Sequence, residues 1–178
     1  MARIADPEHL AGELIQLGTV ASVDYGAATC TVEIGDLVTG DLPWLAPRAG
    51  GVKVWSPPSV GEQCALLCPE GDLASGIVLL GIWSDANPPP SNDPAIVHLA
   101  FPDGAAIAYN HGTHALALTL PAGGTMEVYV PGGTKWNGDI DLNGNLTTPD
   151  DVIAGGVSLK NHTHGGVTAG GAQTGAPA

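Results

Sequence analysis

Apolar and polar positions alternate along most of the chain, and glycine, proline and aspartate interrupt the alternation at short intervals. A period of two is typical of β-strands that bury one face. Before Trp83 the pattern predicts five short strands, at residues 18–24, 29–34, 52–55, 63–68 and 76–83. Five strands within about 70 residues predict a small closed barrel of the oligonucleotide/oligosaccharide-binding (OB) type.

The residues before this barrel have a different pattern. Asp6-Pro7-Glu8 has the features of a helix start, namely an N-cap, a first-turn proline and a first-turn acid. Leucines follow at helical spacing. The pattern predicts a short amphipathic helix over residues 6–16, with His9 as a solvent-facing side chain.

A proline-rich run, Asn87 to Pro94, forms a stiff polar break after the barrel. Beyond it the alternation predicts short strands at 95–101, 105–109, 116–120 and 125–130, followed by scattered apolar positions up to Leu159. Glycine pairs mark the corners between these segments. One such ribbon cannot bury its own apolar face. Three chains interleaved around a common axis would cover that face and pair the open strand edges.

Composition supports a slender protomer that needs partners, because the chain has 26 Gly and 15 Pro but a single Phe. The formal net charge is −13, with only five Lys and Arg residues. Nucleic-acid binding and adsorption to anionic lipid both depend on basic side chains, so the composition excludes both as main functions. Any encounter with a membrane would have to be driven mechanically.

The three cysteines, Cys30, Cys64 and Cys68, are an odd number without CxxC spacing and lie in apolar segments. We expect buried, reduced thiols that pack like small hydrophobic side chains. The chain has no pattern of a cleaved signal peptide and no apolar stretch approaching the ~20 residues of a membrane span. The sequence therefore predicts a soluble protein that is not exported by a signal peptide.

The candidate chemistry is concentrated in His162-Thr163-His164. In an extended strand residues i and i+2 point to the same side, so both imidazoles would project together. Three copies of the chain would present six imidazole nitrogens to one point, enough for an octahedral metal ion. The alternative is a pair of surface histidines in a flexible tail. A second close pair, His111 and His114, has a spacing of three and includes Gly112, which predicts surface or turn histidines.

An enzyme is disfavoured by the same residues. Metal-dependent hydrolases that contain HxH normally continue with Asp-His or another acidic ligand, whereas this chain continues with Gly165-Gly166-Val167-Thr168. The GxSxG, HExxH and P-loop patterns are absent from the sequence. We predict that the protein is not an enzyme and has no catalytic residues.

Several segments together resemble a known family. Residues 17–24, 41–51 and 55–63 resemble the N-terminal barrel of baseplate assembly protein V, and residues 138–144 and 155–167 resemble its shaft and apex. That family forms the central spike of contractile-tailed bacteriophages and of related pyocin-like particles. The resemblance covers nearly the whole chain from about residue 14, and the combination is far more specific than HxH alone.

The resemblance implies an all-β homotrimer in which an OB-fold barrel is followed by an intertwined triple-stranded β-helix and a metal-capped apex. It divides the chain into an N-terminal helix or arm (1–17), an OB-fold collar (18–86), a proline-rich linker (87–94), a β-helical shaft (95–159) and the apex (160–178). His162 and His164 of three chains would supply six ligands to one iron ion per trimer. Calcium or chloride near the apex is also implied for some members, without ligands that can be assigned here.

The function implied is mechanical. The family member would be a structural tail spike that pierces the bacterial outer membrane when the sheath of a contractile injection machine contracts. Its partners would be the tail tube or baseplate hub and, by contact, the host outer membrane, but not nucleic acid. It would lie at the baseplate tip of the virion, after assembly in the host cytoplasm. The alternative is the tip of a phage-derived secretion or pyocin-like particle, and a third hypothesis is a metal-dependent hydrolase.

Overall fold

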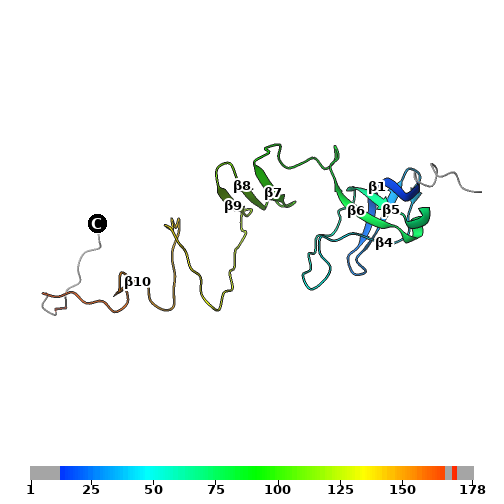
Figure 1. Ribbon diagram of the computed structural model, residues 1–178. Helices are drawn as coiled ribbons and strands as arrows, with labels where there is room; N and C mark the ends of the chain where they lie inside the picture. Colours follow the sequence, from blue (N-terminus) through cyan, green and yellow to red (C-terminus); the bar gives the residue numbers. More distant parts are fainter. Residues whose placement is uncertain (1–12, 167–169, 172–178) are drawn as a thin grey trace, which may run out of the picture. The chain divides into compact units, whose positions relative to one another are not determined.

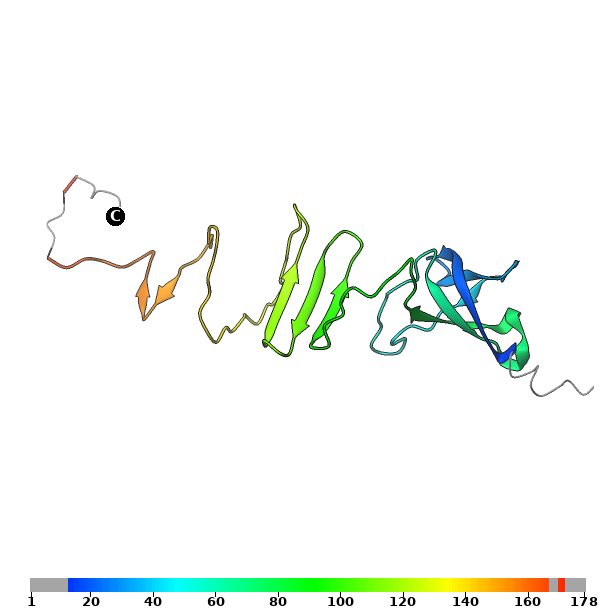
Figure 2. The ribbon, with the colours of Figure 1, turned by 90° about the horizontal axis from the view of Figure 1, so that it is seen from above.

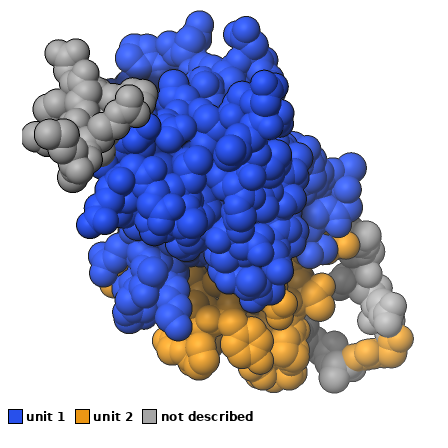
Figure 3. All heavy atoms as spheres, turned by 90° about the vertical axis from the view of Figure 1, so that its right-hand side faces the viewer, with its two compact units in different colours: residues 1–126 blue, residues 127–178 orange. Residues whose placement is uncertain are grey.

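A computed structural model describes residues 13–166 and 170–171 (Figure 1). The chain divides into two compact units, residues 1–126 and 127–178, which Figure 3 distinguishes by colour. Regular structure in the described residues consists of strands, two short 3-10 turns at Pro69–Gly71 and Leu73–Ser75, and a trace of helix at Glu13 and Leu14. The all-β prediction is confirmed.

The first unit begins with a six-stranded antiparallel sheet (Figure 1). Its strands are β1 (Ile15–Asp24), β2 (Thr29–Ile34), β3 (Leu37–Val38), β4 (Leu42–Pro43), β5 (Gln63–Leu67) and β6 (Ile77–Ile82). The order is β3-β2-β1-β5-β6, and β4 pairs with β2 as well. Directly after β4, Trp44 forms a parallel bridge with Val78 of β6, and the Leu45 N–H donates to the Val78 carbonyl at 2.8 Å. This contact closes the sheet into a barrel.

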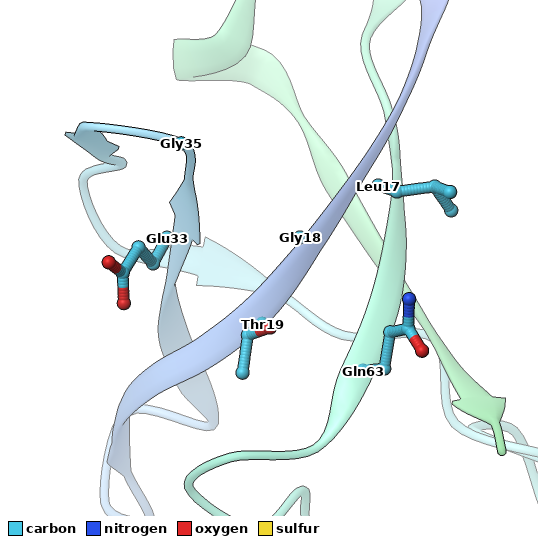
Figure 4. A pocket seen from close by; sticks show the side chains of 6 residues that line it. All are labelled: Leu17, Gly18, Thr19, Glu33, Gly35 and Gln63. Atoms are coloured by element: carbon cyan, nitrogen blue, oxygen red, sulfur yellow. The ribbon is translucent and has the colours of Figure 1, made fainter. Parts of the chain in front are cut away.

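The ten-residue strand β1 is long enough to serve two neighbours. Its first half pairs with β5 and its second half with β2, and a register shift between Val20 and Ser22 bends the strand. At Gly18 the β2 residue Val32 leaves no room for a side chain, because an added Cβ would lie 2.5 Å from Val32 Cγ1. Figure 4 shows this part of β1 beside the β2 residue Glu33. The barrel core is small and contains Val20, Cys30, Val32, Leu42, Cys64, Leu66, Cys68 and Val78.

Two details of the barrel differ from the sequence predictions. Residues 52–55 do not form a strand. Among the described residues their one β-type pairing is an isolated bridge between Lys53 and Ala49, which lies on the same loop. The helix predicted over 6–16 ends by Leu14, because Ile15 already pairs with Leu67 of β5. The remainder of that predicted helix, residues 6–12 with His9, lies outside the described residues.

After the proline-rich segment, a three-stranded antiparallel sheet consists of β7 (Ile96–Ala100), β8 (Ala106–Asn110) and β9 (Ala115–Thr119) (Figure 2). The register aligns Val97 with Tyr109 and Leu116 in one row, and Leu99 with Ile107 and Leu118 in the next. We call these six residues the large apolar face. The opposite face has more alanines, with His98 aligned with Ala108 and Ala117, and Ala100 aligned with Ala106 and Thr119.

The end of the first unit and most of the described second unit have little regular structure. Residues 120–152 contain no strand, and the strand predicted over 125–130 is wrong for the single chain, in which no described segment pairs with it. A short hairpin follows, formed by β10 (Ile153–Ala154) and β11 (Val157–Ser158). Its turn requires two positive φ angles, 57° at Gly155 and 86° at Gly156. Within the described residues, no helix is long and apolar enough to cross a membrane.

Candidate metal centre at the apex

The β10–β11 hairpin is held to the segment that follows it by the side chain of Asp151. One Asp151 carboxylate oxygen accepts hydrogen bonds from the backbone N–H groups of Val152 at 2.9 Å and Lys160 at 3.0 Å. The Ser158 side chain bonds to the same carboxylate and is the main reason that the pKa of Asp151 lies below its ordinary value, followed by the Lys160 N–H. Asp151 therefore ties both ends of the hairpin together.

Ser158 carries this arrangement on toward the histidines. Its hydroxyl oxygen accepts a hydrogen bond from the Asn161 N–H at 2.8 Å, and its carbonyl accepts one from the His162 N–H at 3.2 Å. The chain consequently makes a turn between β11 and His162. Hydrogen bonds to Asp151 and Ser158 fix where that turn begins.

The same turn orients the His162 ring. Its Nδ1 lies 3.0 Å from the Ser158 carbonyl oxygen and 3.2 Å from that of Leu159. A carbonyl oxygen only accepts, so the proton belongs on Nδ1 and the lone pair on Nε2. Metal-binding histidines typically have this arrangement, in which the second ring nitrogen donates to a carbonyl and fixes the tautomer.

The two candidate ligands lie together. The ring centroids of His162 and His164 are 5.1 Å apart, with the ring planes at 76°, and both side chains are exposed. In residues 13–166 and 170–171 no group of three or more His, Cys, Asp or Glu side chains is arranged to hold a metal ion. His162 and His164 of one chain can offer two imidazole nitrogens to a metal ion.

The other histidines and the cysteines are placed differently. His111 and His114 are exposed in the turn between β8 and β9, as predicted. All three cysteines are free and buried, which confirms the prediction of reduced core thiols. Burial raises the pKa of the Cys64 thiol to about 11, with smaller contributions from Cys30 and Glu62. The pKa values of Cys30 and Cys68 are also raised by burial, so all three thiols are protonated at neutral pH in the barrel core.

Sequence reasoning missed the support around the histidines. The roles of Asp151 and Ser158 depend on a two-residue hairpin that is too short to leave an alternation pattern. The available signal was the glycine pair 155–156 between two Val- or Ile-containing dipeptides. That signal predicts a hairpin turn, but it does not predict which side chains bond across it.

Comparison with known proteins bears on both ends of the chain. Residues 16–83 match a family described as the Type VI secretion system/phage-baseplate injector OB domain, and residues 156–178 match the GpV apex motif. The chain is also 36% identical over 137 residues to the spike protein of Escherichia phage P2. The chain is a homologue of a phage baseplate spike protein. The alignment covers 74% of this spike homologue and 65% of the length of the phage P2 protein.

The matches agree with the geometry at each end of the spike homologue. The first match covers all six barrel strands apart from Ile15 at the start of β1, which confirms the OB-fold prediction. The second contains β11 and both apex histidines. The matched proteins are structural spike and baseplate proteins and not enzymes.

Proposed function

We propose that the chain is the homotrimeric spike of a contractile injection machine, located at the baseplate tip, and that it pierces the bacterial outer membrane when the sheath contracts. The observation that carries this proposal is the combination, in one chain, of an injector OB domain and an apex motif. The identity to a phage spike protein supports the same role. The function is mechanical, so the protein needs rigidity in place of catalysis.

The exposed apolar surface supports a trimer. On the large apolar face, Val97 is 71% exposed and Leu116 is 72% exposed. Contiguous apolar surface of this kind usually marks a protein interface. If three copies turn the large apolar face toward a common axis, each copy covers this face of the other two.

The segment without strands supports an intertwined shaft. Residues 120–152 contain scattered apolar side chains, of which Met126, Ile140 and Leu146 are each about two thirds exposed or more. Their backbone groups also lack strand partners in the described part of the chain. A triple-stranded β-helix would pair each chain with its neighbouring copies and bury these side chains. The shaft would then form only on assembly.

The apex histidines fit a structural metal site. We propose one iron ion per trimer, held by Nε2 of His162 and His164 from three chains. The carbonyl bond to His162 Nδ1 leaves Nε2 available, and imidazole is a ligand that suits iron. Six protein ligands leave no position for a substrate, so the bound ion would supply a cross-link between chains. Calcium or chloride near the apex has no ligands that we can name.

The OB-fold collar would attach the spike to the tail tube or baseplate hub. An acidic chain with a net charge of −13 has no basic surface large enough for nucleic acid, so we assign the barrel to protein contacts. The outer membrane would be a mechanical contact only. The protein would be made and assembled in the host cytoplasm before it reaches the virion.

The second candidate is the tip of a phage-derived secretion or pyocin-like particle, because the matching OB family includes Type VI secretion injectors. Electron microscopy of assembled particles that carry a gold-labelled copy of the chain tests the location. We expect label at the baseplate tip, and label on the sheath or on no particle would contradict the proposal. A DNA-filled head on the labelled particles distinguishes a phage from a secretion particle and from a pyocin-like particle.

A further inference from the structure

The barrel carries a cleft that takes no part in the apex or the shaft. Residues 44–55 leave β4 as a hairpin-like loop, in which the Val54 N–H donates to the Arg48 carbonyl at 3.0 Å. This loop encloses a cleft of about 370 Å³. The side chains that give the cleft its chemistry are Trp44, Arg48, Lys53, Val54 and Trp55, and alanines form the rest of the lining.

Aromatic surface forms one part of the cleft. The indole rings of Trp44 and Trp55 have centroids 5.6 Å apart and planes at 57°, so they form an angled wall and not a flat platform. Trp55 is 61% exposed and Val54 is 42% exposed. Large exposed aromatic side chains at a cleft are typical of interaction surfaces.

The polar side chains of the cleft are all hydrogen-bond donors. Arg48 and Lys53 are exposed cations, and the two indole groups add N–H donors. No lining side chain is an acceptor. A sugar hydroxyl both donates and accepts, so it would leave half of its hydrogen bonds unmet by these side chains, whereas a carboxylate only accepts.

The local charge is opposite to that of the whole chain. Residues 42–61 contain Arg48 and Lys53 and no Asp or Glu, although the chain has 18 acidic residues and only five Lys and Arg. A long polyanion such as nucleic acid would meet the repulsion of the remaining acidic surface. A short segment with one or two carboxylates would interact with the cleft alone, because screening limits exposed charges to about 8–10 Å.

We propose that this cleft docks a segment of another protein in which carboxylates flank an apolar side chain. Arg48 and Lys53 bind the carboxylates, and Trp44, Val54 and Trp55 cover the apolar side chain. The segment belongs to the component on which the spike is mounted, and that identification rests on the proposed function. The inference that the cleft binds carboxylates does not rest on the proposed function, because it follows from the charge and the hydrogen-bond donors of the cleft.

The test uses the full-length protein and fluorescently labelled dodecapeptides in which Leu and Phe alternate with Asp and Glu, with Asn and Gln, or with Lys and Arg. Fluorescence anisotropy in about 150 mM salt measures binding. We expect saturable binding of the acidic peptide only. The double variant Arg48→Glu/Lys53→Glu should weaken it about tenfold or more. Lys135→Glu/Lys160→Glu, which changes the net charge equally but lies outside the cleft, should leave it unchanged.

Three binding results would overturn the inference. These are no binding of the acidic peptide, equal binding of the neutral peptide, and equal loss of binding in the two double variants. If Arg48→Glu/Lys53→Glu dissociates the assembly in light scattering, the cleft is a contact between copies and not a docking site. If the protein proves to be monomeric and still binds the acidic peptide, the docking role of the cleft is supported and the proposed trimeric spike is contradicted. Failure of the docking proposal and failure of the proposed function are therefore distinguishable.

Discussion

Gly18 lies at a position in the barrel that has no room for a side chain. A Cβ at this position would lie 2.5 Å from Val32 Cγ1 and 2.7 Å from the Glu33 carbonyl oxygen, a backbone atom that cannot move without shifting β2. We expect Gly18→Ala to destabilise the protein by about 1–3 kcal/mol. Chemical denaturation at fixed protein concentration measures the effect.

Gly40→Ala is the matched control for this prediction. Gly40 lies in the loop before β4, has no positive φ angle, and has no atom within 4 Å of the position that a Cβ would occupy. Its substitution should change stability by less than about 0.5 kcal/mol. Equal effects of the two substitutions would show that β1 and β2 do not approach as closely as described.

The buried thiols make stability depend on alkaline pH. The pKa of Cys64 rises from 9.0 to about 11 in the folded protein because burial disfavours the thiolate. Its contribution to stability is therefore complete below pH 9.0 and is lost as the pH rises toward 11. We expect Cys64→Ala to flatten this alkaline decline in thermal unfolding midpoints. An unchanged decline would contradict the assignment.

The apex histidines should control metal binding without controlling assembly. We expect His162→Ala/His164→Ala to lose the metal completely, as measured by elemental analysis, while light scattering still detects the trimer. The strands below the apex would bury their own apolar surface, which is why the trimer should remain. The same analysis on His111→Ala/His114→Ala, a histidine pair in an exposed turn, should find the metal content unchanged. Metal loss in both variants would contradict the site.

Asp151 should act on the apex through the backbone. Asp151→Asn keeps both histidines but weakens the hydrogen bonds that lead to Ser158 and Lys160, and we expect metal affinity to fall about tenfold. Because the pKa of Asp151 is lowered, its stabilising effect is present above its ordinary value of 3.8 and is lost as the pH falls below it. Competition with a chelator measures the affinity. An unchanged affinity would show that the hairpin does not position His162.

At the scale of the elements, the sequence best predicted those strands of five or more residues that pair with another strand of the same chain. The strand predicted over 29–34 matches β2 exactly, and β5 to β9 agree within one or two residues. The prediction of a strand over 52–55 was wrong, because alternation of apolar and polar residues indicates a segment with an apolar face but does not show whether a partner strand is present. The two-residue strands β3 and β4 are too short to leave a pattern, although β4 leads into the contact that closes the barrel.

The shaft should assemble independently of the barrel. A fragment that begins at Ser91 contains the large apolar face and the segment without strands, so we expect it to form a trimer by itself in light scattering. Residues 1–90 should remain folded through the core of the barrel. An unfolded shaft fragment together with a trimeric barrel fragment would show that the contacts between chains lie at the other end.

At the scale of the whole molecule, the sequence could predict a need for partners but not their arrangement. The alternation, the glycine corners and the scarcity of aromatic residues all indicated a ribbon that cannot bury its apolar side. The described chain agrees, since its second unit has one short hairpin and many exposed apolar side chains. Pairing between copies is absent from a single chain, so neither the sequence nor one protomer determines the register of the shaft.

The net charge of the molecule can be read from the sequence alone, unlike the arrangement of the chains in an assembly. A net charge of −13 disfavours nucleic acid as a ligand, and it sets apart Arg48 and Lys53, the two cations of the Trp44–Trp55 cleft. Their grouping with the indole rings could not be predicted from the sequence, because it depends on how the loop folds against the barrel. The structure shows that the two cations and the two indole rings line one cleft.

Native mass spectrometry of the purified protein, never exposed to a chelator, tests the central claim most directly. The account predicts a single species of about 53 kDa, three times the 17.8 kDa chain, with the additional mass of one iron ion. A folded monomer at micromolar concentration, a trimer without metal, or one metal ion in every chain would contradict it.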